Sequence, residues 1–244
     1  MASGKLKKEN FGYSVPVNAP LYQPFPVYYR DAQVLSIDYE TDLDAALALL
    51  PSRLEIEGPA VATAIFADYP WSTVGAYLEV AQVLKCKYEG RDVAYAVHFH
   101  VTTPAAMSAG REIAGFPKKM GEIGFDVDDF YSSYLDRPSG VRICSADFTP
   151  VKKIATLNDP MKKEWVSLRV IPNPLDPANP SLRELIGTEW NLGPGEVWGG
   201  VGHCHLTGAS AHDPYHKLPV KEIVGSSLFL GSMAASGVTF LEEL

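Results

Sequence analysis

The chain has 244 residues, of which 46% are hydrophobic and 20% charged, a composition typical of a globular protein with a substantial core. Its formal net charge of -8 at pH 7 argues against binding to nucleic acid, which requires a basic surface. Cys86, Cys144 and Cys204 lack the spacing of a metal site or a disulfide framework, and no apolar run reaches the length of a membrane span. We therefore expect a cytoplasmic protein that does not associate with a membrane.

Residues 1–26 are rich in proline and polar side chains. We expect them to form an extended arm that lies on the surface or across a neighbouring subunit. Residues 27–244 contain no Ser/Gly linker, change of composition or internal repeat, which predicts a single domain.

Two short helices are expected. The first covers 42–50, with Thr41 or Asp42 as its N-terminal cap. The second covers 105–113 and is followed by Gly115, a residue suited to the C-terminal cap of a helix.

Most of the remaining periodicity is that of strands, because short apolar runs are rich in β-branched and aromatic residues. Such runs cover 60–69, 74–84, 93–101, 141–148 and 165–171. The glycines of 193–200 indicate a hairpin turn. Many strands and few helices predict a mainly β fold, an antiparallel sheet forming a sandwich or a closed barrel.

Glu79 is unusual because it lies within an apolar strand, 75–81. A buried, unpaired carboxylate costs several kcal/mol or becomes neutral. Glu79 therefore either faces solvent or pairs with a buried cation or a ligand, and buried ion pairs can be structural as well as functional.

Lys118 and Lys119 follow an apolar segment whose backbone is restricted by Gly115 and Pro117. Two adjacent lysines are usually both solvated, but neighbours on an extended segment point to opposite sides, so one of them can enter an interior pocket. A lysine in a desolvated pocket loses its proton more readily and becomes a nucleophilic amine, as imine formation with a ketone requires.

Other catalytic patterns are weak. His98 with His100, and His203 with His205, each place two histidines on one face of a strand, but zinc needs three or four ligands and no third one stands out. We expect no metal site. The sequence also has neither a dinucleotide-binding fingerprint nor the Gly-x-Ser-x-Gly elbow of serine hydrolases.

Two segments of the chain carry a resemblance to a known family. The segment Gly-Arg-Glu-Ile-Ala-Gly-Phe-Pro-Lys-Lys at 110–119 resembles the active-site segment of the acetoacetate decarboxylase family, and Leu-Pro-Val-Lys-Glu-Ile-Val at 218–224 resembles a second segment of that family. The resemblance extends in order over about 25–240 and includes 41–45, 54–56, 168–173 and 183–186.

The resemblance implies roles for individual residues. Lys118 matches the lysine that forms the Schiff base, and Lys119 matches the neighbour proposed to activate it. Glu79 matches an active-site glutamate, and Arg30 matches an arginine that interacts with the substrate carboxylate. Ala64 falls where the family's decarboxylases carry a second glutamate, which implies one carboxylate fewer in the pocket.

By resemblance, we expect a barrel-like, mainly antiparallel β fold, a homo-oligomer, and decarboxylation of a small β-keto acid such as acetoacetate. The lysine imine is its own electron sink, so no cofactor is expected. One alternative is an aldolase-dehydratase that uses the same imine of pyruvate with an aldehyde. A second alternative, from another class, is a non-catalytic barrel that binds a small ligand.

Overall fold

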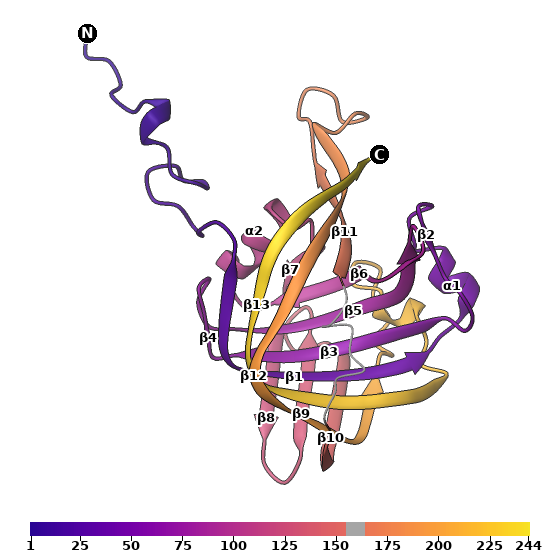
Figure 1. The fold of residues 1–244 in the computed structure, drawn as a ribbon. Helices are drawn as coiled ribbons and strands as arrows, with labels where there is room; N and C mark the ends of the chain where they lie inside the picture. The colour runs from indigo at the N-terminus through magenta and orange to yellow at the C-terminus, as the bar shows by residue number, and fades with distance from the viewer. Residues whose placement is uncertain (155–163) are drawn as a thin grey trace.

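The computed structural model describes residues 1–154 and 164–244, and its core is one 13-stranded sheet with two α-helices (Figure 1). The helices are α1 (Leu43–Leu47) and α2 (Pro104–Glu112), and short 3-10 turns cover Lys8–Asn10 and Tyr215–Lys217. The strands are β1 (Val27–Glu40), β2 (Leu54–Glu55), β3 (Val61–Tyr69), β4 (Trp71–Ser72), β5 (Tyr77–Tyr88), β6 (Arg91–Val101), β7 (Lys118–Met120), β8 (Glu122–Val127), β9 (Tyr131–Asp136), β10 (Arg142–Ile154), β11 (Glu164–Ile171), β12 (Leu182–His205) and β13 (Glu222–Glu243).

The sheet closes on itself. Strands follow the order β11-β6-β5-β3-β1-β13-β12, and β11 also pairs with β12, so these strands form a ring. Beyond the ring, β12 continues into a layer formed by β10, β9 and β8. Figure 1 shows β12 and β13 running side by side along their length, as their antiparallel register requires. The predicted barrel-like β fold is confirmed.

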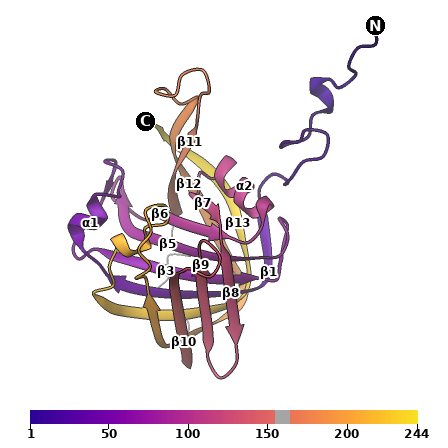
Figure 2. The same cartoon turned by 180° about the vertical axis from the view of Figure 1, so that it is seen from behind.

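The sheet is not entirely antiparallel, which corrects one detail of the expectation. Strand β6 pairs in parallel with β7 on one stretch and with β11 on another. The β6–β7 pair is the important one, because helix α2 lies between these two strands in sequence. A parallel pair requires such a crossover connection, and this one places α2 beside β7 (Figure 2).

Two apolar clusters pack on the two faces of the shared strands. Ala64 and Phe66 of β3 belong to one cluster, whereas Ile65 and Ala67 belong to the other. This division follows from the alternation of side chains along a strand. The second cluster also includes Ala106 of α2 and surrounds the site described below.

The helices and turns agree well with the sequence. Asp42 caps α1 by accepting a hydrogen bond from the backbone N–H of Ala45 (3.1 Å), although the helix ends at Leu47 instead of residue 50. Glu89 and Gly90, which both have positive φ (49° and 77°), form the turn between β5 and β6.

The expected hairpin turn at 193–200 is wrong, because these residues lie inside β12. The strand tolerates Pro194 because the pairing of β12 with β13 shifts register between Leu192 and Gly195. Proline within a sheet is accommodated at such irregularities, where no ladder hydrogen bond is lost.

The N-terminal segment 1–26 extends away from the sheet in Figure 1 and contains only one 3-10 turn. Its C-terminal part contacts the body, because Tyr22 is buried and its hydroxyl donates a hydrogen bond to Glu112 of α2. Contact of this arm with a neighbouring subunit stays a prediction. No helix among the described residues is long and apolar enough to span a membrane.

Candidate active site

Lys118 begins strand β7 directly after a tight turn that follows α2. At Gly115 the backbone has φ +70°, and a Cβ there would lie 2.8 Å from the Cα of Arg169, so this position requires glycine. The chain then reverses, and the Phe116 N–H donates a hydrogen bond to the Gly110 carbonyl (2.9 Å). The turn thereby brings the Lys118 side chain back against the last turn of α2.

Lys118 and Glu79 form a buried ion pair. The Lys118 side chain is 7% exposed and that of Glu79 is 3% exposed, and Nζ lies 2.6 Å from Oε2. Oε2 has no hydrogen bond of good geometry within the described residues, so the pair is held by charge more than by an aligned hydrogen bond. Burial of either group alone would leave an uncompensated charge, which is strongly destabilising.

The pair lies in an enclosed cavity whose wall is apolar and rich in aromatic residues. Six aromatic residues line it: Phe25, Tyr29, Tyr77, Phe99, Phe116 and Trp190. The remaining lining residues are valine, alanine and glycine, apart from Glu79 and Lys118 themselves. The cavity offers about 20 Å³ to the centre of a water molecule, which is room for about one water. A ligand therefore enters only when side chains of the wall move.

Two tyrosines of this wall bond to each other. The hydroxyls of Tyr29 and Tyr77 lie 3.2 Å apart, and the Lys118 Nζ lies 5.4 Å from the centre of the Tyr77 ring. Burial, with the nearby Glu79 carboxylate, raises the pKa of both tyrosines well above the usual range. They are therefore neutral phenols at physiological pH.

Lys119 points to the other side of β7, as alternation along a strand predicts. The parallel register pairs Lys118 with Phe99 and Lys119 with His100. The Lys119 Nζ lies 3.0 Å from Oδ1 of Asp213 and also donates to the His212 carbonyl. Its side chain is 39% exposed, so Lys119 does not line the cavity.

Comparison of the whole chain with known proteins identifies its family. The family model described as acetoacetate decarboxylase matches residues 14–244. The chain belongs to the acetoacetate decarboxylase family. It is similar to the acetoacetate decarboxylase of Clostridium acetobutylicum (30% identical, covering 90% of this chain and 91% of the relative).

Two further similarities agree with this membership. The chain is 29% identical to the protein named Decarboxylase DEC1 of Cochliobolus heterostrophus, with 94% of each chain covered. It superposes on the crystal structure of the acetoacetate decarboxylase of Legionella pneumophila with a TM-score of 0.87, at 25% identity, covering 100% of this chain and 99% of the other.

Ala64 does not lie where the family resemblance places it. The antiparallel register pairs Glu79 of β5 with Ala67 of β3, so Ala67 and Ile65 share the face of Glu79. Ala64 is buried on the opposite face and belongs to the other apolar cluster. The expectation that Ala64 stands beside the lysine is therefore wrong. Glu79 is nevertheless the single carboxylate among the described residues that line the cavity.

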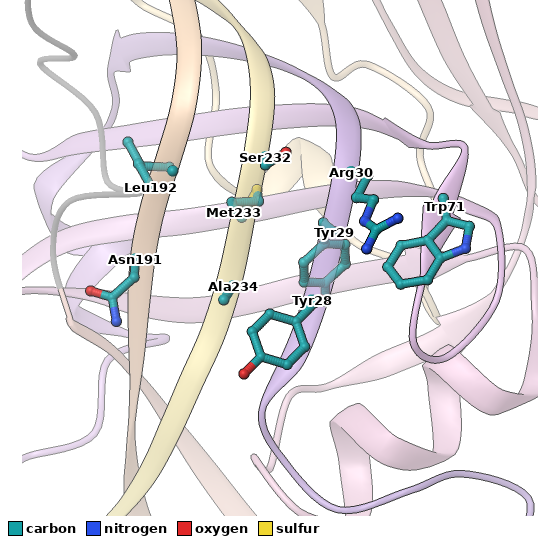
Figure 3. A pocket seen from close by; sticks show the side chains of 10 residues that line it. Tyr28, Tyr29, Arg30, Trp71, Asn191, Leu192, Ser232, Met233 and Ala234 are labelled. Carbon is teal, nitrogen blue, oxygen red and sulfur yellow. The ribbon is translucent and has the colours of Figure 1, made fainter.

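Arg30, expected to contact the substrate carboxylate, lies outside the Lys118 cavity. It lines an open pocket of about 370 Å³, where its guanidinium carbon lies 4.6 Å from the centre of the Trp71 ring (Figure 3). Tyr29, the preceding residue, lines both this pocket and the cavity, whereas Arg30 does not line the cavity, because neighbours on β1 face opposite sides. The structure thus brings Lys118 and Glu79 together and leaves Arg30 outside.

The histidines form no metal cluster. No group of three or more metal-binding side chains occurs within residues 1–154 and 164–244. His100 instead bonds to Asp213 through Nε2 (3.0 Å) and to the Tyr215 hydroxyl through Nδ1 (3.0 Å). Burial lowers the pKa of His100 to about 4, so it is neutral at pH 7. Burial alone would raise the pKa of Asp213, but its contacts with Lys119 and His100 lower it.

Of the residues that line the cavity, the sequence singled out only Lys118 and Glu79, and Gly110 and Trp190 are two that it missed. Gly110 of α2 faces the Lys118 stem, and a Cβ there would lie 2.6 Å from the lysine Cδ. Trp190 of β12 also lines the cavity. A glycine inside a helix was a usable signal for Gly110, because it lowers helix propensity and usually has a packing reason. Trp190 gave no signal, because β12 itself was not predicted.

Proposed function

We propose that this protein decarboxylates a β-keto acid through a Schiff base on Lys118. The observation that carries the proposal is the buried Lys118–Glu79 pair, 2.6 Å apart, inside an aromatic cavity with no other charged group among its described lining residues. Membership of the acetoacetate decarboxylase family supports the same reaction class.

The first step needs a neutral amine, because an ammonium group has no lone pair with which to attack a ketone. Glu79 is the proton acceptor in contact with Nζ, so we assign it the removal of that proton. The amine then attacks the ketone carbon of the substrate, and loss of water gives an iminium ion. Glu79 is also placed to return the proton that water formation requires.

The second step breaks the carbon–carbon bond next to the carboxylate. Its electron pair moves into the iminium as CO2 leaves, and an enamine remains. Protonation of the enamine carbon and hydrolysis of the imine release a ketone and restore the amine. The aromatic wall favours this step, because the departing carboxylate loses its hydration before its charge disappears.

The test is to incubate the protein with acetoacetate, reduce it with borohydride, and map the adduct by mass spectrometry while release of CO2 is measured. We expect one adduct, on Lys118, and no adduct on any other lysine in Lys118→Ala. An adduct mainly on Lys119, or spread over surface lysines, would overturn the assignment.

The same preparation separates the alternative functions. An aldolase-dehydratase would condense pyruvate with an aldehyde and release no CO2 from any β-keto acid. A non-catalytic carrier would not react with a 1,3-diketone, whereas an activated lysine converts it to an enaminone that absorbs in the ultraviolet.

A further inference from the structure

Trp190 has a buried hydrogen-bond donor without a partner. Its ring lines the Lys118 cavity, and its Nε1 has no hydrogen-bond acceptor anywhere in the part of the chain that the structure describes. The ring packs against two other rings, with its centre 5.1 Å from that of Trp165 and 6.1 Å from that of Tyr29. A buried donor in this state is unfavourable in the empty protein but is available to a ligand.

A β-keto acid introduces a need for such a donor. Its carboxylate must enter a cavity in which the charges of Lys118 and Glu79 already compensate each other. Arg30 lies in a different pocket and supplies no charge there. Among the described residues of the wall, the side-chain donors besides Lys118 are the hydroxyls of Tyr29 and Tyr77 and the indole of Trp190.

One of these hydroxyls donates to the other at 3.2 Å, so only one O–H of the pair is free to donate to a carboxylate. The Trp190 N–H gives up no hydrogen bond when a carboxylate arrives. We propose that the indole N–H of Trp190 donates to the substrate carboxylate and thereby selects keto acids over simple ketones. This inference rests on the function proposed above.

A neutral donor also suits the chemistry. Loss of CO2 removes the negative charge of the carboxylate, so a cation bound to it would stabilise the ground state more than the transition state. An indole N–H orients the group at a smaller cost to the reaction, since a hydrogen bond between uncharged donor and anion is weaker than an ion pair.

The test compares two ligands that differ by the carboxylate. Acetoacetate and acetone both present a methyl ketone, and borohydride trapping on Lys118 reports the saturation of each. In Trp190→Phe, which keeps an aromatic ring and removes the donor, we expect the half-saturating acetoacetate concentration to rise about tenfold. The value for acetone should change less than twofold.

Trp165→Phe is the matched control, because the Trp165 ring packs against Trp190 at a tilt of 57° but does not line the cavity. This control should change the half-saturating concentrations of acetoacetate and acetone by the same factor. If Trp190→Phe also raises both concentrations by the same factor, or leaves that of acetoacetate unchanged, Trp190 only packs and the inference is wrong. If the unsubstituted protein gives no adduct with either ligand, the proposed function fails and this inference fails with it.

Discussion

Gly110 offers a way to displace the Lys118 amine without changing its chemistry. In Gly110→Ala, the added methyl carbon would lie 2.6 Å from Cδ and 2.8 Å from Cε of Lys118. Carbon atoms that are not bonded pack at about 3.5–4.0 Å. The lysine stem must therefore move by about 1 Å, and its Nζ leaves the position 2.6 Å from Glu79.

This displacement should lower turnover by about 10²-fold, since a misplacement of about 1 Å at a reacting group has effects of that size. Stability should change little, because two contributions oppose each other. Alanine is preferred to glycine in a helix by about 1 kcal/mol, whereas crowding in a packed core costs about 1–3 kcal/mol. The measurements are kcat/KM for acetoacetate and the free energy of unfolding in urea.

Ser108→Ala is the matched control, because it raises helix propensity in α2 without adding an atom next to Lys118. It should keep normal turnover. The reasoning fails if Gly110→Ala retains normal turnover. It also fails if turnover falls only in proportion to the fraction of protein that unfolds.

Two further predictions follow from the charged groups. Glu79→Gln should lose about 10²-fold in turnover, as expected for a group that moves protons, and should also lower the free energy of unfolding, because Lys118 stays buried without its partner. Exposed Glu57→Gln is the control, and near-normal turnover of folded Glu79→Gln would make Glu79 purely structural. The lowered pKa of His100, about 4, means that the unfolded chain binds the proton first as pH falls. The contribution of His100 to the free energy of unfolding is therefore fully present above about pH 6.5 and decreases towards pH 4. Between pH 7 and pH 5 the loss is about 2 kcal/mol. Urea unfolding at pH 7 and pH 5 should show this loss in the unsubstituted protein and a smaller loss in His100→Gln. An equal decrease in the free energy of unfolding in both proteins would contradict the prediction.

The sequence singled out each member of the central pair, because each residue breaks a local rule. Glu79 is a carboxylate inside an apolar strand, and Lys118 follows an apolar segment with a fixed backbone. Such breaks mark buried charges that must find each other. The alternation of neighbouring side chains predicted that only one of the two lysines faces inward, and the family resemblance implied that this one is Lys118. The structure places Lys118 and Lys119 on opposite sides of β7.

The errors arise where pairing between distant strands decides the result. Ala64 was assigned by counting along one strand, but a shift of one position moves a side chain to the other face. Arg30 was likewise expected in the cavity, but it follows the buried Tyr29 on the same strand, and neighbouring side chains on a strand face opposite sides. Strand β12 was not predicted, because its glycines and Pro194 resemble a turn and only the register shift against β13 makes them part of a strand.

Lys119 provides a test of whether the neighbouring charge or the enclosure of the cavity matters for Lys118. The Lys119 Nζ lies 3.0 Å from Asp213, a carboxylate that also contacts His100 and Arg137 on the far side of β7 from the cavity. Lys119→Gln should therefore keep turnover within about threefold of normal. Its stability should fall by at most about 1 kcal/mol, the size expected for a partly exposed ion pair. If the variant instead loses about 10²-fold both in turnover and in acetone trapping on Lys118, at unchanged stability, then the charge of Lys119 activates Lys118 across the strand, and the argument from opposed faces is wrong.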